Sequence, residues 1–282
     1  MRAVVAARNL LKAWLLAIGL VGLFALVGWA LGGVRLLSIF VFCALLLLGG
    51  AYAVFDRVVL GMVGARELPL AEAPLLHSTV ERLAAQAGVV KPRLHLIPDG
   101  LPRALATGRG RSSSALAVSA GLVSACTPAE LEGVLAHELA HVRQHDVQVQ
   151  TAVVVLAAAM LEASRIGGFL ERALLFVLGP VASACVHLLV SPKREFEADR
   201  AAAQLCGSPH GLADALTRLE QAAELVDFAG SPATEPLYTI NPFMERGLAA
   251  LFVTHPPVAE RVRRLRELDP AWREKLREMS AA

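Results

Sequence analysis

The sequence predicts a mainly α-helical integral membrane protein that also contains one small β-sheet. Of its 282 residues, 55% are hydrophobic and only 18% are charged, and the mean hydropathy is +0.54. Soluble domains usually carry more charge and fewer apolar side chains. Most segments place apolar residues at helical spacing, while three short segments have the pattern of strands. The apolar excess therefore indicates membrane segments beside a folded helical domain.

Two long uncharged runs near the N-terminus predict a transmembrane hairpin over residues 1–56. Ala13–Val34 has 22 residues and Leu36–Phe55 has 20. At about 1.5 Å per residue, each run is long enough to cross a hydrocarbon core of about 30 Å. Gly32 and Gly33 are expected to begin the turn between them. A signal peptide would instead have a shorter apolar core, followed by a cleavage site of small residues.

The charges around this hairpin predict its orientation. Only Arg35 lies between the two runs, whereas five basic residues flank them: Arg2, Arg8, Lys12, Arg57 and Arg66. By the positive-inside rule, both ends of the hairpin lie in the cytoplasm. We therefore expect a multi-pass protein of the cell (plasma or inner) membrane, with the lipid bilayer as a partner and the folded domain facing the cytoplasm.

Residues 57–146 are predicted to form the first part of the folded domain. Ala71–Gly88 has apolar residues at helical spacing, and its glycine is a plausible stop. Short strands are expected at Arg93–Ile97, Leu105–Gly108 and Ala115–Ser119, since these segments are short, apolar and bounded by turn residues.

Residues 147–190 are predicted to form a second apolar hairpin. Its runs, Val147–Leu161 and Ala173–Val190, are shorter or less apolar than the N-terminal ones. A buried helical pair inside the folded domain suits such lengths too, but the overall apolar excess favours the membrane. Residues 191–282 are then expected to complete the folded domain with several further helices.

The strongest motif is His137-Glu138-Leu139-Ala140-His141, an H-E-x-x-H pattern. Thr127, Pro128 and Glu130 read as the capped start of a helix through this motif. Histidines at i and i+4 share one helix face and can bind a single Zn²⁺. Glu138 beside them can take the proton of a water that the metal activates. The alternative, two structural histidines around a glutamate, would bury three unpaired polar groups.

A catalytic zinc usually has a third protein ligand, and Glu195 is the predicted one. It lies on a helix of its own, with Asp199 one turn further on the same face, where that carboxylate can orient a ligand histidine. The alternative is that Glu195 and Asp199 simply belong to an exposed, charged helix face. Glu162 and Glu171 lack a supporting partner, and His145 lies two turns from the first histidine. The spacing also excludes the metzincin arrangement, which needs a third histidine at the position of Val147.

The order of these features resembles the HtpX-type membrane metalloproteases of the M48 peptidase family. An N-terminal hairpin precedes H-E-x-x-H, a second apolar hairpin follows, and E-x-x-x-D comes after it. Asn241-Pro242, the stretch Leu251–Pro257 and Glu260-Arg261 resemble the family's C-terminal signature, and Leu105–Gly108 resembles a segment before its substrate-side strand. Arg103 departs from the pattern, since the family commonly has Asn there.

The resemblance implies a zincin-like, α-helical catalytic domain and a role for each matching residue. His137, His141 and Glu195 match the zinc ligands, Glu138 the general base and Asp199 the supporting acid. The family also places the loop of His255 beside the site, so we predict His255 as a catalytic residue. It could stabilise the oxyanion or act as a gate; a loop histidine bonded to backbone is the alternative. Arg261 is expected to pair with a carboxylate.

The sequence therefore predicts a zinc-dependent endopeptidase with protein substrates. The resemblance implies that these are misfolded or damaged membrane proteins. We expect the substrate to lie extended along an edge strand from residues 104–119, where it gains backbone hydrogen bonds. Processing of lipidated peptides, as in the related prenyl-protein proteases, is one alternative. A membrane scaffold that binds zinc without hydrolysis is another, although the intact Glu138 argues against it.

Charge and motifs exclude several other classes of partner. The net charge is only +2, so nothing indicates nucleic-acid binding. Gly108-Arg109-Gly110 lacks the following G-K-[ST] of a phosphate-binding loop, and we expect no nucleotide site. The four cysteines form no C-x-x-C pair and look like small buried hydrophobic residues.

Overall fold

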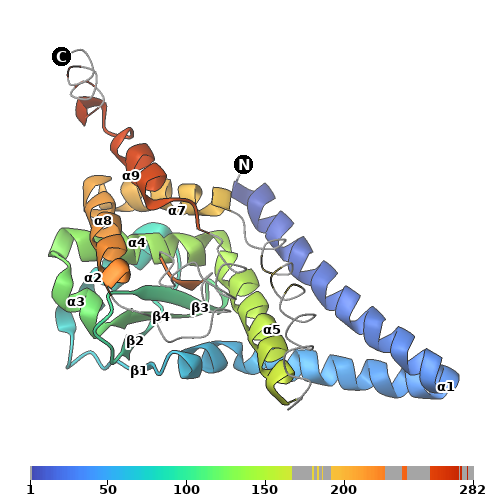
Figure 1. Ribbon diagram of the computed structural model, residues 1–282. Coiled ribbons are helices and arrows are strands. Elements are labelled where there is room, and N and C mark those ends of the chain that lie inside the picture. The colour runs from blue at the N-terminus through green and yellow to red at the C-terminus, as the bar shows by residue number, and fades with distance from the viewer. Residues whose placement is uncertain are drawn as a thin grey trace.

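A computed structural model describes residues 2–166, 192–225, 237–239 and 255–272, with positions 180, 183, 186, 274 and 278 (Figure 1). The described chain is mostly helical and contains one small sheet, as the sequence predicts. Its principal elements in chain order are α1 (Arg2–Met62), β1 (Arg66–Glu67), α2 (Pro74–Ala87), β2 (Arg93–Ile97), β3 (Ala104–Gly110), β4 (Ser113–Ser119), α3 (Ala120–Ala125), α4 (Pro128–Gln144), α5 (Asp146–Ile166), α7 (Pro192–Cys206), α8 (His210–Leu225) and α9 (Val258–Arg266).

The sheet has the strand order β1-β2-β4-β3, which leaves β3 at one edge. β2 and β4 are parallel, while β1 pairs with β2 and β3 with β4 in antiparallel fashion. The three predicted strands are confirmed. The two-residue β1 was not predicted, because a segment this short has no period that a sequence pattern can reveal.

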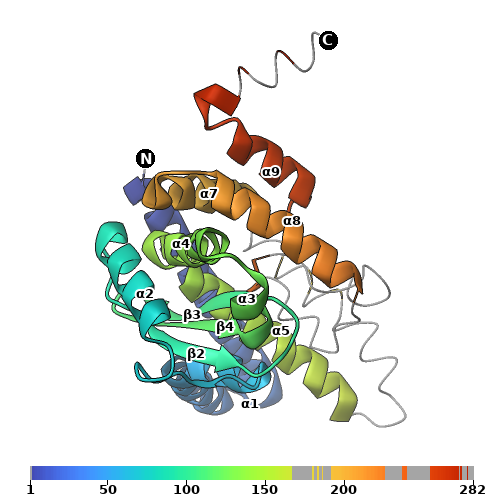
Figure 2. The ribbon, with the colours of Figure 1, turned by 90° about the vertical axis from the view of Figure 1, so that its left-hand side faces the viewer.

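The two faces of the sheet bury different helices. Alternate residues of β3 and β4, such as Ala106 and Leu116, belong to the core formed with α2, α4, α7 and α8. Their neighbours, such as Leu105 and Ala117, pack with Val59 at the end of α1 and with α5. Strand side chains alternate between faces, so both faces of these apolar strands are covered. Figure 2 shows the sheet between α4 and α1.

α1 consists of two helical limbs that fold back on one another (Figure 1). The backbone leaves helical geometry at Gly32 (φ −170°) and Gly33 (φ 64°), which confirms the predicted turn. The limbs approach closely at Gly28, where a Cβ atom would lie 2.8 Å from the carbonyl oxygen of Leu36. A glycine is therefore needed at this position for the limbs to pack.

Among the described residues, one helical stretch, Phe24–Leu46, is long and apolar enough to cross a membrane. This stretch contains the Gly32–Gly33 break, so it is not a single straight span. Its large apolar side chains are exposed, including Trp29, Leu31 and Phe42. Such exposure is costly in water and suits a lipid surface. That the two limbs cross a bilayer stays a prediction.

The first predicted run of the second apolar hairpin lies within α5, and the N-terminal half of this helix is packed inside the protein. Val147, Val153, Val154 and Ala157 are completely buried, and α5 lies against α1 and β3. The alternative of a buried helix therefore describes this half of α5. The second run, Ala173–Val190, lies outside the described residues except for its three single positions.

Candidate active site

α4 begins and ends at well-defined residues. Thr127 Oγ1 accepts a hydrogen bond from the backbone N–H of Glu130, and the Glu130 carboxylate accepts one from the backbone N–H of Thr127, which confirms the predicted capping box. At the other end, the backbone of His145 adopts a left-handed conformation with φ 62°. This residue alone separates α4 from α5, so the chain turns sharply after the histidine motif.

The left-handed conformation of His145 makes a prediction about stability. A Cβ atom is unfavourable there, whereas glycine adopts this conformation freely. His145→Gly is expected to raise the free energy of unfolding by about 1 kcal/mol relative to His145→Ala, because the two variants differ only in that Cβ. Urea denaturation of both variants measures the difference. Equal stability of the two would show that the turn carries no such strain.

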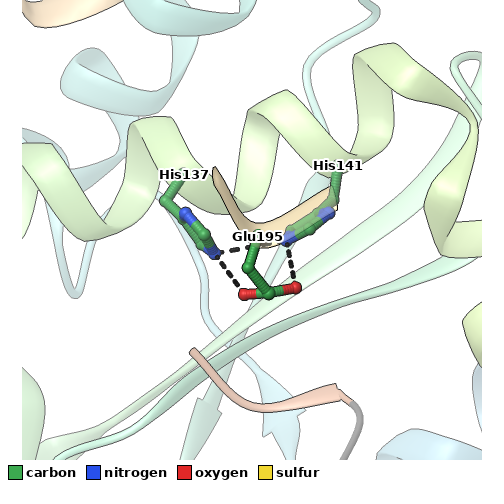
Figure 3. Close-up of side chains that lie close together, drawn as sticks. All are labelled: His137, His141 and Glu195. Atoms are coloured by element: carbon green, nitrogen blue, oxygen red, sulfur yellow. Dashed lines mark hydrogen bonds and ion pairs between the residues drawn. The ribbon is translucent and has the colours of Figure 1, made fainter. Parts of the chain in front are cut away.

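His137, His141 and Glu195 come together although 53 residues lie between the last two in the chain. The Nε2 atoms of the two imidazoles lie 3.2 Å apart. The Glu195 carboxylate faces both, with 3.5 Å from its Oε2 to His137 Nε2 and 3.5 Å from its Oε1 to His141 Nε2 (Figure 3). All three side chains are buried. α4 supplies the histidines and α7 the carboxylate.

The three side chains fit a bound zinc ion. Two nitrogen ligands at tetrahedral zinc lie about 3.3 Å apart, close to the observed spacing of the imidazole nitrogens. Glu195 Oε2 is buried and has no hydrogen-bond partner. A buried carboxylate oxygen in that state is costly unless a cation satisfies it. Two imidazoles and one carboxylate are also the donor set of a catalytic zinc site.

A buried ion pair lies behind His137. Asp199 Oδ1 is 3.0 Å from His137 Nδ1, and the Arg261 guanidinium binds both oxygens of Asp199 at 2.7 and 2.9 Å. Burial alone would lower the pKa of His137, but the carboxylates of Asp199 and Glu195 raise it to about 9. A metal ion at Nε2 would therefore displace a proton, and its binding would tighten as the pH rises.

Glu195 remains ionised despite complete burial. Burial alone would raise its pKa, but the charges of His255 and His141 hold the pKa well below its usual range. His255 Nε2 lies 3.7 Å from Glu195 Oε2, and the imidazole is almost fully buried. The structure therefore places His255 beside the predicted metal ligands, as the family resemblance implied.

Glu138 lies in the same buried region as the histidines. Its Oε1 accepts a hydrogen bond of 2.8 Å from Thr239 Oγ1, and only 2% of the residue is exposed. The carbonyl oxygen of Thr239 in turn accepts a hydrogen bond from Arg261. Glu197, two residues after Glu195 on α7, is exposed.

Sequence reasoning missed three residues at this site: Asp146, Arg194 and Thr239. Asp146 lies 3.3 Å from His141 Nδ1, and Arg194 lies beside Asp146. Asp146 lies five residues after His141. Because the helix ends between these two residues, their spacing does not predict that their side chains meet. Thr239 sits in a stretch whose only sequence signal is that of a loop.

A comparison with protein families identifies the family of this chain. The sequence model of Peptidase family M48 matches residues 70–269, which include every residue of the site. The chain belongs to peptidase family M48.

Close relatives of this M48 chain carry the name protease HtpX homolog. The one from Persephonella marina is 38% identical over 269 residues, covering 88% of this chain and 93% of the relative. The one from Acidiphilium cryptum is 39% identical over 279 residues, covering 92% and 96%. A crystal structure of S. mikatae Ste24p is similar at a TM-score of 0.49 and 20% identity, covering 93% of this chain and 66% of that one.

Arg103, where the M48 chain differs from the family pattern, makes specific contacts in the structure. Arg103 is buried at the start of β3, where its guanidinium pairs with Asp99 and lies 5.5 Å from the centre of the Tyr238 ring. Tyr238 in turn pairs with Leu105 of the edge strand. Arg103 therefore supports the segment that carries Thr239.

The outer edge of β3 is covered by other parts of the chain. Tyr238 lies against it at Leu105, Thr151 Oγ1 accepts a hydrogen bond of 3.2 Å from the Gly108 N–H, and the Gln148 side chain donates to the carbonyl oxygen of Arg109. β3 is an edge strand, as substrate pairing would need. In this structure, however, the chain's own groups occupy that edge at each of these positions.

Proposed function

We propose that this M48 chain is a zinc-dependent membrane endopeptidase that degrades misfolded or damaged membrane proteins. The observation that carries the proposal is the convergence of His137, His141 and the buried carboxylate of Glu195, whose Oε2 has no hydrogen-bond partner, with Glu138 on the same helix. His137, His141 and Glu195 would hold the zinc. The similarity to proteins named protease HtpX homolog supports proteolysis.

The chain's own residues can perform each proton transfer of peptide hydrolysis. Bound zinc would supply a Lewis acid that polarises the scissile carbonyl and activates the attacking water. Glu138 would take the proton as the water oxygen adds to the carbonyl carbon, and would return it to the leaving amine as the C–N bond breaks. Thr239 Oγ1 donates to Glu138 Oε1, which leaves Oε2 of that carboxylate for the proton.

The supporting residues hold this arrangement in place. Asp199 would keep a proton on His137 Nδ1, so that Nε2 carries the free lone pair. Arg261 compensates the buried charge of Asp199 and lies 3.5 Å from Glu195. His255, whose Nε2 lies 3.7 Å from Glu195 Oε2, would stabilise the negative charge that develops on the substrate oxygen.

The N-terminal limbs would place this chemistry beside the bilayer. Their exposed apolar side chains and the charges flanking them favour a hairpin in the membrane, with the catalytic domain in the cytoplasm. Unfolded segments of membrane proteins are then the substrates within reach. We expect neither nucleic acid nor nucleotide among the partners.

Metal removal tests the proposal. The full-length protein, purified in detergent, is expected to cleave casein and a destabilised membrane protein, to lose both activities when a chelator strips the metal, and to regain them with stoichiometric zinc. Cleavage by protein shown to be free of metal would overturn the zinc mechanism. Zinc binding without cleavage of either substrate would instead support the non-hydrolytic scaffold.

A further inference from the structure

The two nitrogen atoms of His141 have different surroundings. Nε2 faces His137 and Glu195, while Nδ1 lies 3.3 Å from Asp146 Oδ2. A neutral imidazole carries its proton on only one nitrogen, and a hydrogen-bond acceptor at one nitrogen fixes the proton there. The carboxylate of Asp146 therefore favours the proton on Nδ1, which leaves the lone pair of Nε2 toward the candidate metal site.

Asp146 has a second charged neighbour, Arg194, with which it forms an ion pair. Its Oδ1 lies 3.3 Å from Nη1 of Arg194. Asp146 is 0% exposed and Arg194 is 2% exposed. Burying either charge alone would be strongly unfavourable, so the ion pair offsets part of the cost of burying both side chains. The contact is specific rather than a chance meeting of surface side chains.

The pair also connects the two helices that carry the candidate ligands. Asp146 follows the left-handed turn at His145 directly, and this turn brings its carboxylate back beside His141. Arg194 immediately precedes Glu195 on α7. The ion pair between Asp146 and Arg194 therefore joins the first residue of α5, two residues past the end of the histidine-bearing helix, to the first turn of the glutamate-bearing helix.

We propose that Asp146 is a positioning residue of the metal site. It holds the proton on His141 Nδ1 and, through Arg194, fixes the turn of α7 that presents Glu195. The arrangement repeats, with other residues, the set formed by His137, Asp199 and Arg261, so each ligand histidine has a carboxylate and an arginine behind it. This inference rests on the proposed zinc site.

Asp146→Asn tests the proposal through metal affinity rather than activity. Asparagine has nearly the same size but lacks the charge, so zinc affinity is expected to fall about 10–100-fold. The affinity is measured on the full-length protein in detergent by competition with a chromogenic chelator. Asp269→Asn is the matched control, because Asp269 also pairs with a histidine, His210, at 2.8 Å but on the partly exposed surface. The control is expected to bind zinc as the unaltered protein does.

A second variant separates positioning from a purely structural role. Asp146→Asn removes the negative charge of Asp146 from beside the buried guanidinium of Arg194, and this loss by itself is expected to lower stability. The double variant Asp146→Asn/Arg194→Gln removes both charges. If the pair only stabilises the fold, the double variant regains native stability and native zinc affinity, and the proposal is overturned. If Asp146 positions His141, the zinc affinity of the double variant stays reduced. The absorption spectrum of the cobalt-loaded double variant then differs from that of the cobalt-loaded unaltered protein.

The two proposals fail in different ways. If the unaltered protein binds no zinc, the zinc site itself is wrong. If the unaltered protein binds zinc and Asp146→Asn binds it equally tightly, only the role of Asp146 is wrong.

Discussion

Glu138→Gln is expected to lower kcat for peptide cleavage by about 10²–10⁴-fold while the protein keeps its zinc. Glutamine cannot take the proton of the attacking water. It can still accept the hydrogen bond from Thr239, so the local packing should persist. Zinc content by mass spectrometry and cleavage rates of the purified protein measure the two effects separately.

Glu197→Gln is the matched control for this experiment. Glu197 is an exposed glutamate on α7, and the same chemical change there should leave both zinc content and kcat unaltered. Full activity of Glu138→Gln would show that another group takes the proton. A loss of zinc together with activity would assign Glu138 to the metal site instead of to proton transfer.

Arg261→Met is expected to destabilise the metal-free protein by about 3–5 kcal/mol. Arg261 is 0% exposed and its guanidinium lies against the carboxylates of Asp199 and Glu195. Methionine would fill much of the space but leave both buried charges without their cation. Zinc would compensate Glu195 in part, so the loss should be smaller in the zinc-loaded protein. Urea denaturation of both forms measures this difference.

Arg263→Met, on the same helix, serves as the comparison. Arg263 pairs with Glu260 at 2.8 Å, but half of its side chain is exposed, and surface pairs of this kind add little to stability. This variant should unfold at the same urea concentration as the unaltered protein. Equal unfolding midpoints for the Arg261 and Arg263 variants would mean that Arg261 does not compensate the buried carboxylates.

Local sequence signals were sufficient to predict α4 and the position of its two histidines. Thr127 and Glu130 define the start of α4, and the spacing of His137 and His141 then places both imidazoles on one face. Glu195 could be selected only by elimination, because the meeting of α4 and α7 depends on tertiary packing that no local pattern encodes. The structure brings these side chains together, while their roles as ligands stay predictions.

Asp146 shows why other residues of the site could not be predicted from the sequence. Its position depends on a left-handed backbone at His145, and a histidine gives no clear signal for that conformation. The interpretation of α5 had a different difficulty. An apolar run of marginal length suits a bilayer or a protein interior equally well, and only the contacts of α5 with α1 and β3 distinguish them.

The covered edge of β3 changes what a peptide would gain by pairing with it. A free edge offers unpaired N–H and C=O groups, so an added strand gains new hydrogen bonds. Here Tyr238, Thr151 and Gln148 already lie along that edge. An incoming strand would exchange one set of hydrogen bonds for another, with little net gain in free energy. The same covering makes this edge a poor template for a second copy of the chain, which protects an apolar sheet from edge-to-edge aggregation.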